Sequence, residues 1–491
     1  MSSSPPSRSG GTEMADVAAT PPKGASIQLL KVLGPVHVWA LGVGIVLVGE
    51  FMGWNYGVGK GGAFGALIAA WVIGLLYTCV AMIDSEVTST VAAAGGQYAQ
   101  AKHTIGPLMA FNVGLYLVLA YTMLEAADVQ VAGQLVQIGV ARIAPDAGDA
   151  VLASTHFWWA FTILSLVCLA WLNYRGVFMT LTVNFIITAA AFASIIILFF
   201  GTQFATALGH PDAQLLHHDL LTDLPYGWLG VVAALHFGIW YYLGIEGTCQ
   251  AAEEVRSPGR ALPLGTMTGI ITLLIAAALT WYVACGLLPW EYVGWDLELA
   301  PLYDAAKIIN WPTMEVILFI GTLFSAIASA NGCINDAARA WFSMGRDRYL
   351  PAWFAAVHPR YRTPFRSILF LIPIAAVFAL KVPLAQIITF SILSGLLNYT
   401  FMPINVWLFR KMWPLGSIRR GFEHPFHPVP AVVLMILCVT TFFAVYLGYG
   451  RQLLAMMLFY WIVSLWFHFR RYQFVRRADQ FTMNWPKPQG F

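Results

Sequence analysis

Long apolar segments separated by short polar ones occupy almost the whole chain from residue 36 to residue 469. A segment of about 20 apolar residues is long enough to cross a bilayer as a helix. Continuous apolar runs such as residues 186–200 indicate helices, because the strands of a membrane barrel alternate apolar and polar positions. We therefore predict an all-α integral membrane protein with twelve spans, at residues 36–59, 62–83, 107–139, 155–173, 177–201, 228–252, 264–288, 312–338, 366–382, 384–409, 429–448 and 452–469.

The composition of the chain favours this class and excludes others. Of the 491 residues, 59% are hydrophobic and only 10% are charged, whereas a soluble domain carries about 25% charged residues. A net charge of +3 is too small for a nucleic-acid-binding protein of this size, so the expected partner is a lipid bilayer and not nucleic acid. The six cysteines contain no CxxC pair, which argues against a disulfide framework or a metal site. We expect no cofactor and infer no obligate protein partner.

The distribution of Lys and Arg predicts the orientation, because cytoplasmic loops carry an excess of these residues. With both termini inside, 22 of the 27 basic residues fall in cytoplasmic segments. Residues 1–30 are polar and lack an apolar signal-peptide core, so we predict a disordered cytoplasmic tail there and a second cytoplasmic tail at 471–491. We expect a multi-pass protein of the cell (inner) membrane. The basic residues on the outer side are Lys60, Arg142, Lys307, Lys381 and Arg451.

Two spans carry polar interruptions between glycines. The first contains Gly49-Glu50 and Gly53, and the sixth contains Gly244-Ile245-Glu246. Each glycine weakens a helix by about 1 kcal/mol relative to alanine, and two interrupted helices in corresponding positions indicate a transporter binding site. Close packing of small residues is the alternative explanation for the glycines. Packing does not account for the two carboxylates, which are costly inside a membrane and usually functional there.

Several motifs follow one another in a characteristic order. In the first span, Val48-Gly49-Glu50-Phe51-Met52-Gly53-Trp54-Asn55 has the pattern small-Gly-acid-aromatic-x-Gly-Trp-Asn. Further motifs are Ala94-Gly95-Gly96-Gln97-Tyr98, then Glu246-Gly247 with Ala251-Ala252-Glu253-Glu254, Pro258, Arg260 and Pro263, then Ser329, Asn331-Gly332, Arg339, Gly345-Arg346-Asp347, Leu350-Pro351 and Thr363-Pro364. Over residues 34–470 the chain thereby resembles the amino acid–polyamine–organocation (APC) superfamily of permeases, and most closely their ethanolamine permease branch.

The resemblance implies a fold and a mechanism. The transporter domain would cover residues 31–470, with a LeuT-like inverted repeat of five plus five helices and discontinuous helices 1 and 6. The first repeat would be residues 36–201 and the second 228–409, followed by two extra helices at 429–469. Transport would proceed by alternating access, and the protein would not be an enzyme.

The resemblance also implies a substrate site between the unwound parts of helices 1 and 6. The positions that carry over are Gly49, Glu50, Phe51 and Gly53 on the first, and Trp240, Tyr242, Gly244 and Glu246 on the second. Relatives that carry amino acids have small residues after the second glycine, where backbone amides hold the substrate carboxylate. Here Trp54 and Asn55 take those places, which argues against carboxylate capture.

The charges inside the predicted spans favour a small cationic amine as substrate. Glu50, Glu125, Asp128 and Glu246 lie at mid-depth, and Glu125 and Asp128 are three residues apart, so they share one helix face. Helices 1, 3, 6, 8 and 10 contain no Lys or Arg at this depth, and a site with acids and no base attracts a cation. Nearby aromatic rings add cation–π contacts, although each ring alone is at least equally well explained by packing. Ethanolamine fits these features, with Asn55 as a partner for its hydroxyl.

Coupling to a proton gradient is the expected energy source, with Glu246 as the proton-binding candidate. The lysine that some relatives place in the fifth helix has no counterpart in residues 177–201. Ser325 and Ser329 could contribute to a sodium site, but small residues at that spacing more often serve packing. Exchange without a coupling ion also remains open. The gating candidates at the cytoplasmic ends of helices 6 and 8 are Glu253, Glu254, Arg256 and Arg339, although the positive-inside bias alone explains each arginine.

Other classes are disfavoured. An intramembrane enzyme would need a motif such as HExxH or a Ser/His pair, and none is visible. A sensor without transport would need a signalling domain for which the tails are short. Within transport, the alternative is an amino acid or polyamine permease or exchanger. The outer loop with His210, Asp212, His217, His218, Asp219 and Asp223 lacks metal-ligand spacing, so we expect a solvated loop.

Overall fold

The computed structural model describes residues 28–143, 151, 154–209, 214–217, 224–296 and 301–470. Nearly all of the two predicted tails, and most of the outer loop that contains His210, lie outside these residues. The regular elements of the described part are all helices, and it contains no strand apart from one isolated bridge between Leu33 and Val255. This confirms the predicted all-α class.

The first predicted span is broken in the structure. It consists of α1 (Pro35–Val46), the short α2 (Val48–Phe51) and the first two turns of α3 (Asn55–Val91). Gly62, with φ 73°, interrupts α3, and the second span follows from there. Between α2 and α3, Met52 is extended and Gly53 has φ 90°, a conformation that a glycine adopts at no steric cost.

The sixth predicted span is broken as well. It begins as α9 (Gly227–Gly238), tightens into the 3₁₀ turn η1 (Ile239–Tyr241), and resumes as η2 (Ile245–Cys249) and η3 (Ala252–Glu254). Gly244 separates the halves with φ 112°. Both discontinuities therefore fall at the glycines that the sequence indicated.

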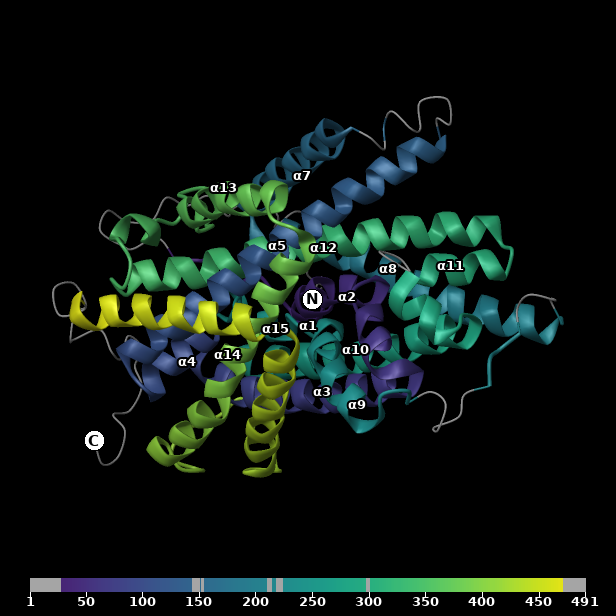
Figure 1. Cartoon of the computed structure of the whole chain (residues 1–491). Coiled ribbons are helices and arrows are strands. Elements are labelled where there is room, and N and C mark those ends of the chain that lie inside the picture. Colours follow the sequence, from purple (N-terminus) through teal and green to yellow (C-terminus); the bar gives the residue numbers. More distant parts are fainter. Residues whose placement is uncertain are drawn as a thin grey trace, which may run out of the picture.

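The remaining predicted spans correspond to long helices. Nine helices of the described residues are long and apolar enough to cross a membrane; α13, of 17 residues, and the α1–α2 pair are shorter. One of the nine, α15, bends at Tyr449 and supplies the last two predicted spans as two arms (Figure 1). The remaining elements are α4 (Gln97–Thr104), α5 (Pro107–Ile143), α7 (Thr155–Arg175), α8 (Val177–Ala207), α10 (Pro258–Leu287), η4 (Tyr292–Asp296), α11 (Pro301–Ile308), α12 (Pro312–Arg346), η5 (Ala352–Ala355), α13 (Phe365–Lys381), α14 (Leu384–Met412) and α15 (Val429–Arg470).

The two broken helices lie at the centre of the bundle. In Figure 1, α1 and α2 are enclosed by the other helices, and α1 packs on α8, α10, α12 and η2. By contrast, α7, α8 and α15 carry exposed apolar side chains, as expected for surfaces that face lipid. The central helices therefore have enough neighbours to bury polar groups, and the functional side chains are found there.

Candidate functional site

The break in the first helix is held by Asn55. Its Oδ1 accepts a hydrogen bond from the Gly53 backbone N–H at 3.1 Å, and its Nδ2 donates to the Val293 carbonyl of η4 at 3.4 Å. Asn55 is fully buried. Asn55, the predicted partner of a substrate hydroxyl, thus caps the helix break in this structure, and its Oδ1 accepts the Gly53 N–H.

The break in the sixth helix is held by Glu246. One carboxylate oxygen accepts the Gly244 N–H at 3.2 Å, and the other accepts the Tyr399 hydroxyl at 2.7 Å. Tyr399 in turn accepts a hydrogen bond from the Tyr77 hydroxyl at 3.1 Å. Glu246 is therefore fixed at the unwound segment by partners from its own turn and from α14.

The two breaks meet at Trp240. A Cβ atom built on Gly49 would lie 2.1 Å from the Trp240 carbonyl oxygen, and one built on Gly53 would lie 2.6 Å from its indole nitrogen. Only glycines allow the ring to pack so closely against the first helix. Trp54 points elsewhere and stacks on Tyr241, with the ring centroids 5.7 Å apart.

A small pocket opens beside this contact. Asp128 is the one charged side chain among the described residues that line it. Its Oδ2 is buried and has no hydrogen-bond partner in the described part of the chain, and the same holds for the Trp240 Nε1. The lining residues are Val48, Met52, Gly53, Tyr56, Ala127, Asp128, Val131, Trp240, Leu384 and Ile388.

The other acids expected at the site do not line this pocket. Glu125 lies one turn before Asp128 and is fully buried, without a hydrogen-bond partner among the described residues. Glu50 is equally buried and unpartnered there, within electrostatic range of Tyr241 and Tyr242. Of the four predicted acids, Asp128 therefore lines the pocket, whereas Glu50, Glu125 and Glu246 do not. Phe51, Tyr242 and Gly244 also lie outside the pocket lining.

The sequence analysis missed several buried polar residues close to the break in the sixth helix. The Asp84 carboxylate accepts hydrogen bonds from Gln97 at 2.5 Å and from Gln100 at 2.8 Å. Asp336 of α12 is fully buried near Gly247. Asp336 could have been found, because it lies inside the predicted eighth span, whereas Asp84 falls one residue beyond the second.

Ion pairs join the ends of the broken sixth helix and α12. Arg339 Nε lies 2.5 Å from Glu254 Oε2, with both side chains buried, and Arg346 lies 2.8 Å from the more exposed Glu253. Burial raises the pKa of Glu254 above its ordinary value, against the opposing effect of the Arg339 charge. Arg256, the remaining gating candidate, is exposed and forms no ion pair among the described residues.

A second buried ion cluster, also missed, anchors the loop between α14 and α15. Glu86 of α3 accepts hydrogen bonds from Arg410 at 2.5 and 2.8 Å, from Arg420 at 2.5 Å and from the His424 N–H at 3.2 Å. Burial lowers the pKa of His424, although the Glu86 charge acts against this shift. The three partners are far from Glu86 in sequence, so no local pattern indicated them.

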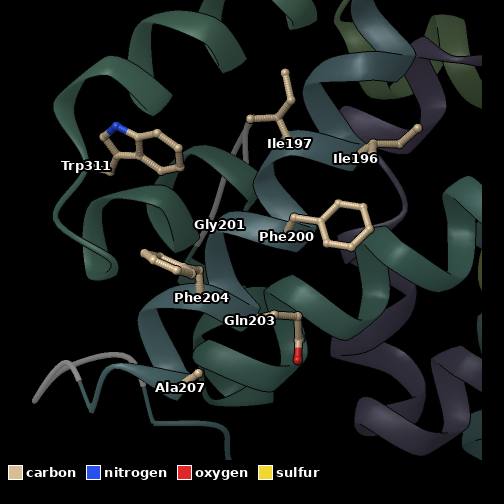
Figure 2. Close-up of a pocket in the computed structure, with 8 residues that line it drawn as sticks. All are labelled: Ile196, Ile197, Phe200, Gly201, Gln203, Phe204, Ala207 and Trp311. Carbon is tan, nitrogen blue, oxygen red and sulfur yellow. The ribbon is translucent and has the colours of Figure 1, made fainter.

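A wider groove lies on the outer face of α8 (Figure 2). Phe200 and Phe204 are 64% and 67% exposed there, and Gln203 is the one polar side chain among the described residues that line it. An apolar groove on a lipid-facing helix suits acyl chains and not a polar substrate. The lining residues are Ile196, Ile197, Phe200, Gly201, Gln203, Phe204, Ala207 and Trp311.

Many apolar spans, two central helices broken at glycines, and a pocket at the breaks that contains a buried acid define a multi-pass membrane transporter. Comparison with known proteins gives the family: residues 36–477 match the amino acid permease family model, and the chain belongs to this family of the APC superfamily. It is 63% identical to an uncharacterized transporter of Rhizobium meliloti, over 97% of this chain and all of that one. It is 25% identical to the methylthioribose transporter of Bacillus subtilis (84% of this chain, 88% of that one) and 25% identical to the branched-chain amino acid permease BcaP of the same species (84% and 87%).

Proposed function

We propose that this permease imports a small cationic amine, with ethanolamine as the best candidate, by alternating access coupled to protons. The observation that carries the proposal is the pair of unpartnered polar atoms in the pocket. Asp128 Oδ2 is an acceptor and Trp240 Nε1 a donor, and both are buried. An amino alcohol matches this pair, because its ammonium group pairs with a carboxylate and its hydroxyl oxygen accepts a hydrogen bond.

The state of the Gly53 amide supports a substrate without a carboxylate. Backbone amides at a half-helix end are suited to bind an anion. Here the Gly53 N–H already donates to Asn55 Oδ1. No basic side chain lines the pocket among the described residues, so a substrate carboxylate would face Asp128 without compensation.

The alternative is an amino acid or polyamine permease or exchanger. The similarity to a branched-chain amino acid permease is the observation in its favour. That relative shares only 25% identity, and the methylthioribose transporter at the same identity carries a different substrate. The relatives therefore support the class of protein, and the pocket chemistry decides the substrate that we propose.

Glu246 is the proposed proton-binding group. It is buried at the unwound segment of the sixth helix and accepts a hydrogen bond from Tyr399 of α14. A change in its charge would therefore alter the contact between the unwound segment and α14. The charge distribution supports cytoplasmic termini and the cell membrane of a bacterium as the location. We retain the assignment of residues 36–201 and 228–409 as the two repeats.

The test is uptake of labelled ethanolamine into liposomes that contain the purified protein, with and without an inward proton gradient. We expect gradient-driven uptake that unlabelled ethanolamine competes for and alanine does not. Asp128→Asn should abolish it, whereas Asp304→Asn, which changes an acid paired with Lys307 on α11, serves as the matched control. Strong competition by alanine would instead establish an amino acid permease.

A further inference from the structure

Asp336 is a buried acid that the proposed transport mechanism does not use. It lies on α12 with its side chain fully buried. Its Oδ1 accepts a hydrogen bond from the Asn335 side chain at 2.9 Å, and its Oδ2 has no partner in the described part of the chain. An ionised carboxylate with a bare buried oxygen is costly, so a group that neutralises it is expected.

The bare oxygen points at the broken sixth helix. A Cβ atom built on Gly247 would lie 2.1 Å from Asp336 Oδ2. The carboxylate therefore reaches the helix backbone one residue after Glu246, at a place that only a glycine leaves open. Any change in the charge of Asp336 acts directly on the unwound segment that has to move during transport.

Arg339 is the one positively charged group that acts on Asp336 within the part of the chain that the structure describes. The Arg339 guanidinium donates to Glu254 at 2.5 Å and to the Asn335 carbonyl at 2.9 Å, and it lies within electrostatic range of Asp336. Arg339 is thus committed to Glu254 in this arrangement, although a second carboxylate competes for it from one turn away. The titratable groups that face Asp336 are Tyr121 of α5, Cys333 and Arg339 of α12, Glu246 of η2 and Glu254 of η3.

We infer that Asp336 binds a proton in the arrangement seen here, in which Arg339 is paired with Glu254, and that loss of this proton transfers Arg339 from Glu254 to Asp336, which loosens the contact between η3 and α12. The inference rests on the proposed proton coupling and adds a second carboxyl to it. The proton passes from Asp336 Oδ2 to water, and the contact opens after the proton has left. Loosening of η3 would also affect the segment before α1, because the Glu254 carbonyl accepts hydrogen bonds from the Val32 and Leu33 N–H groups.

A proton fits this site better than a metal ion. A cation such as sodium or calcium takes several oxygen ligands, typically six or more for calcium. Both oxygens of Glu246 and one oxygen of Asp336 already accept hydrogen bonds. On the side chains around Asp336, the oxygens left without a partner among the described residues are Asp336 Oδ2, Asn335 Oδ1 and Glu254 Oε1, fewer than such an ion takes. Arg339 would also repel a metal ion, whereas a proton needs only the one bare oxygen.

The test compares Asp336→Asn with the wild type in liposomes. Asparagine imitates the protonated form. We therefore expect amine accumulation driven by a proton gradient to fall at least tenfold and its pH dependence to flatten, while counterflow exchange at equal pH falls less than threefold. Asp304→Asn on α11 is the matched control and should follow the wild type.

The outcomes separate the two proposals. If the proton gradient does not change amine accumulation by the wild-type protein, the proposed coupling and this inference are both overturned. A wild type that responds and an Asp336→Asn variant with the same accumulation and the same pH profile overturn the inference alone. Should Asp336→Asn fail to fold, Asp336→Glu decides: a shift in the pH midpoint of uptake by half a unit or more supports the inference, and an unchanged midpoint overturns it.

Discussion

Replacing Asn55 with alanine removes the side-chain oxygen that accepts the Gly53 N–H. The amide then faces the pocket beside Trp240 without a partner. We expect this variant to gain affinity for amino acids, because the freed amide can bind a substrate carboxylate in the way that half-helix ends bind anions.

The size of the effect follows from the bonds exchanged. The lost Asn55 bond joins neutral groups and is worth about 1 kcal/mol, whereas a hydrogen bond from an amide to a carboxylate is worth about 1.5–3 kcal/mol. A carboxylate that displaces Asn55 in the wild type gains roughly 0.5–2 kcal/mol, whereas in the variant it gains the full value of about 1.5–3 kcal/mol. The variant therefore binds a carboxylate about 1 kcal/mol more tightly if the wild type allows this displacement, and up to about 3 kcal/mol more tightly if it does not. This corresponds to a roughly 5- to 150-fold lower inhibition constant for alanine.

The assay is competition by alanine against labelled ethanolamine uptake in liposomes. Asn55→Asp is the first control: it keeps an oxygen for Gly53 but adds a negative charge, so alanine should not gain. Asn173→Ala is the second control. It removes a buried asparagine that does not line the pocket and whose Nδ2 donates to Asn331 Oδ1 at 2.8 Å. If folded Asn55→Ala protein shows the alanine constant of the wild type, the Gly53 amide is not what excludes carboxylates.

Three further predictions concern the pocket and the two ion clusters. Trp240→Phe removes the one indole donor of the pocket, so the KM for ethanolamine should rise about fivefold, as expected for a hydrogen bond of about 1 kcal/mol, while ethylamine uptake, measured in parallel, should change little. Arg339→Gln leaves Glu254 buried without its counter-charge and should destabilise the protein by about 3–5 kcal/mol, measured as a lower Tm. Arg346→Gln, which breaks the more exposed ion pair with Glu253, should destabilise it by less than about 1 kcal/mol. Since the pKa of His424 is lowered in the folded protein, the unfolded chain binds more protons, and stability should fall as the pH drops below about 6.5; His424→Gln should reduce the difference in Tm between pH 5.5 and 7.5, and an unchanged difference would exclude His424 as a cause.

Much of the fold could be predicted from the sequence, because each membrane helix is visible as a continuous apolar segment. The lengths of the apolar segments predicted the spans. Gly53 and Gly244 predicted the two breaks, because a break that needs a positive φ is usually formed by a glycine. The bend of α15 at Tyr449 likewise fell between two predicted spans.

The candidate site was less predictable because its partners come from distant segments. Nothing near Glu246 indicates Tyr399, which is 153 residues away. Glu125 and Asp128 share a helix face, yet only Asp128 lines the pocket, because a difference of one turn decides which side chain reaches the break. The contacts of Asn55 could not be predicted for the same reason: its acceptor in η4 lies 238 residues further along the chain.

The anchored loop between α14 and α15 has a practical consequence for labelling this transporter. Fluorophores and spin labels are usually placed in loops between helices, on the assumption that such loops tolerate insertion. Here Arg420 and His424 reach from the loop into the protein to hold Glu86, so an insertion between residues 413 and 428 would strip a buried carboxylate of its partners. Probes for following the transport cycle therefore belong at exposed positions of α7 or α8, helices that contain no buried charged side chain among the described residues.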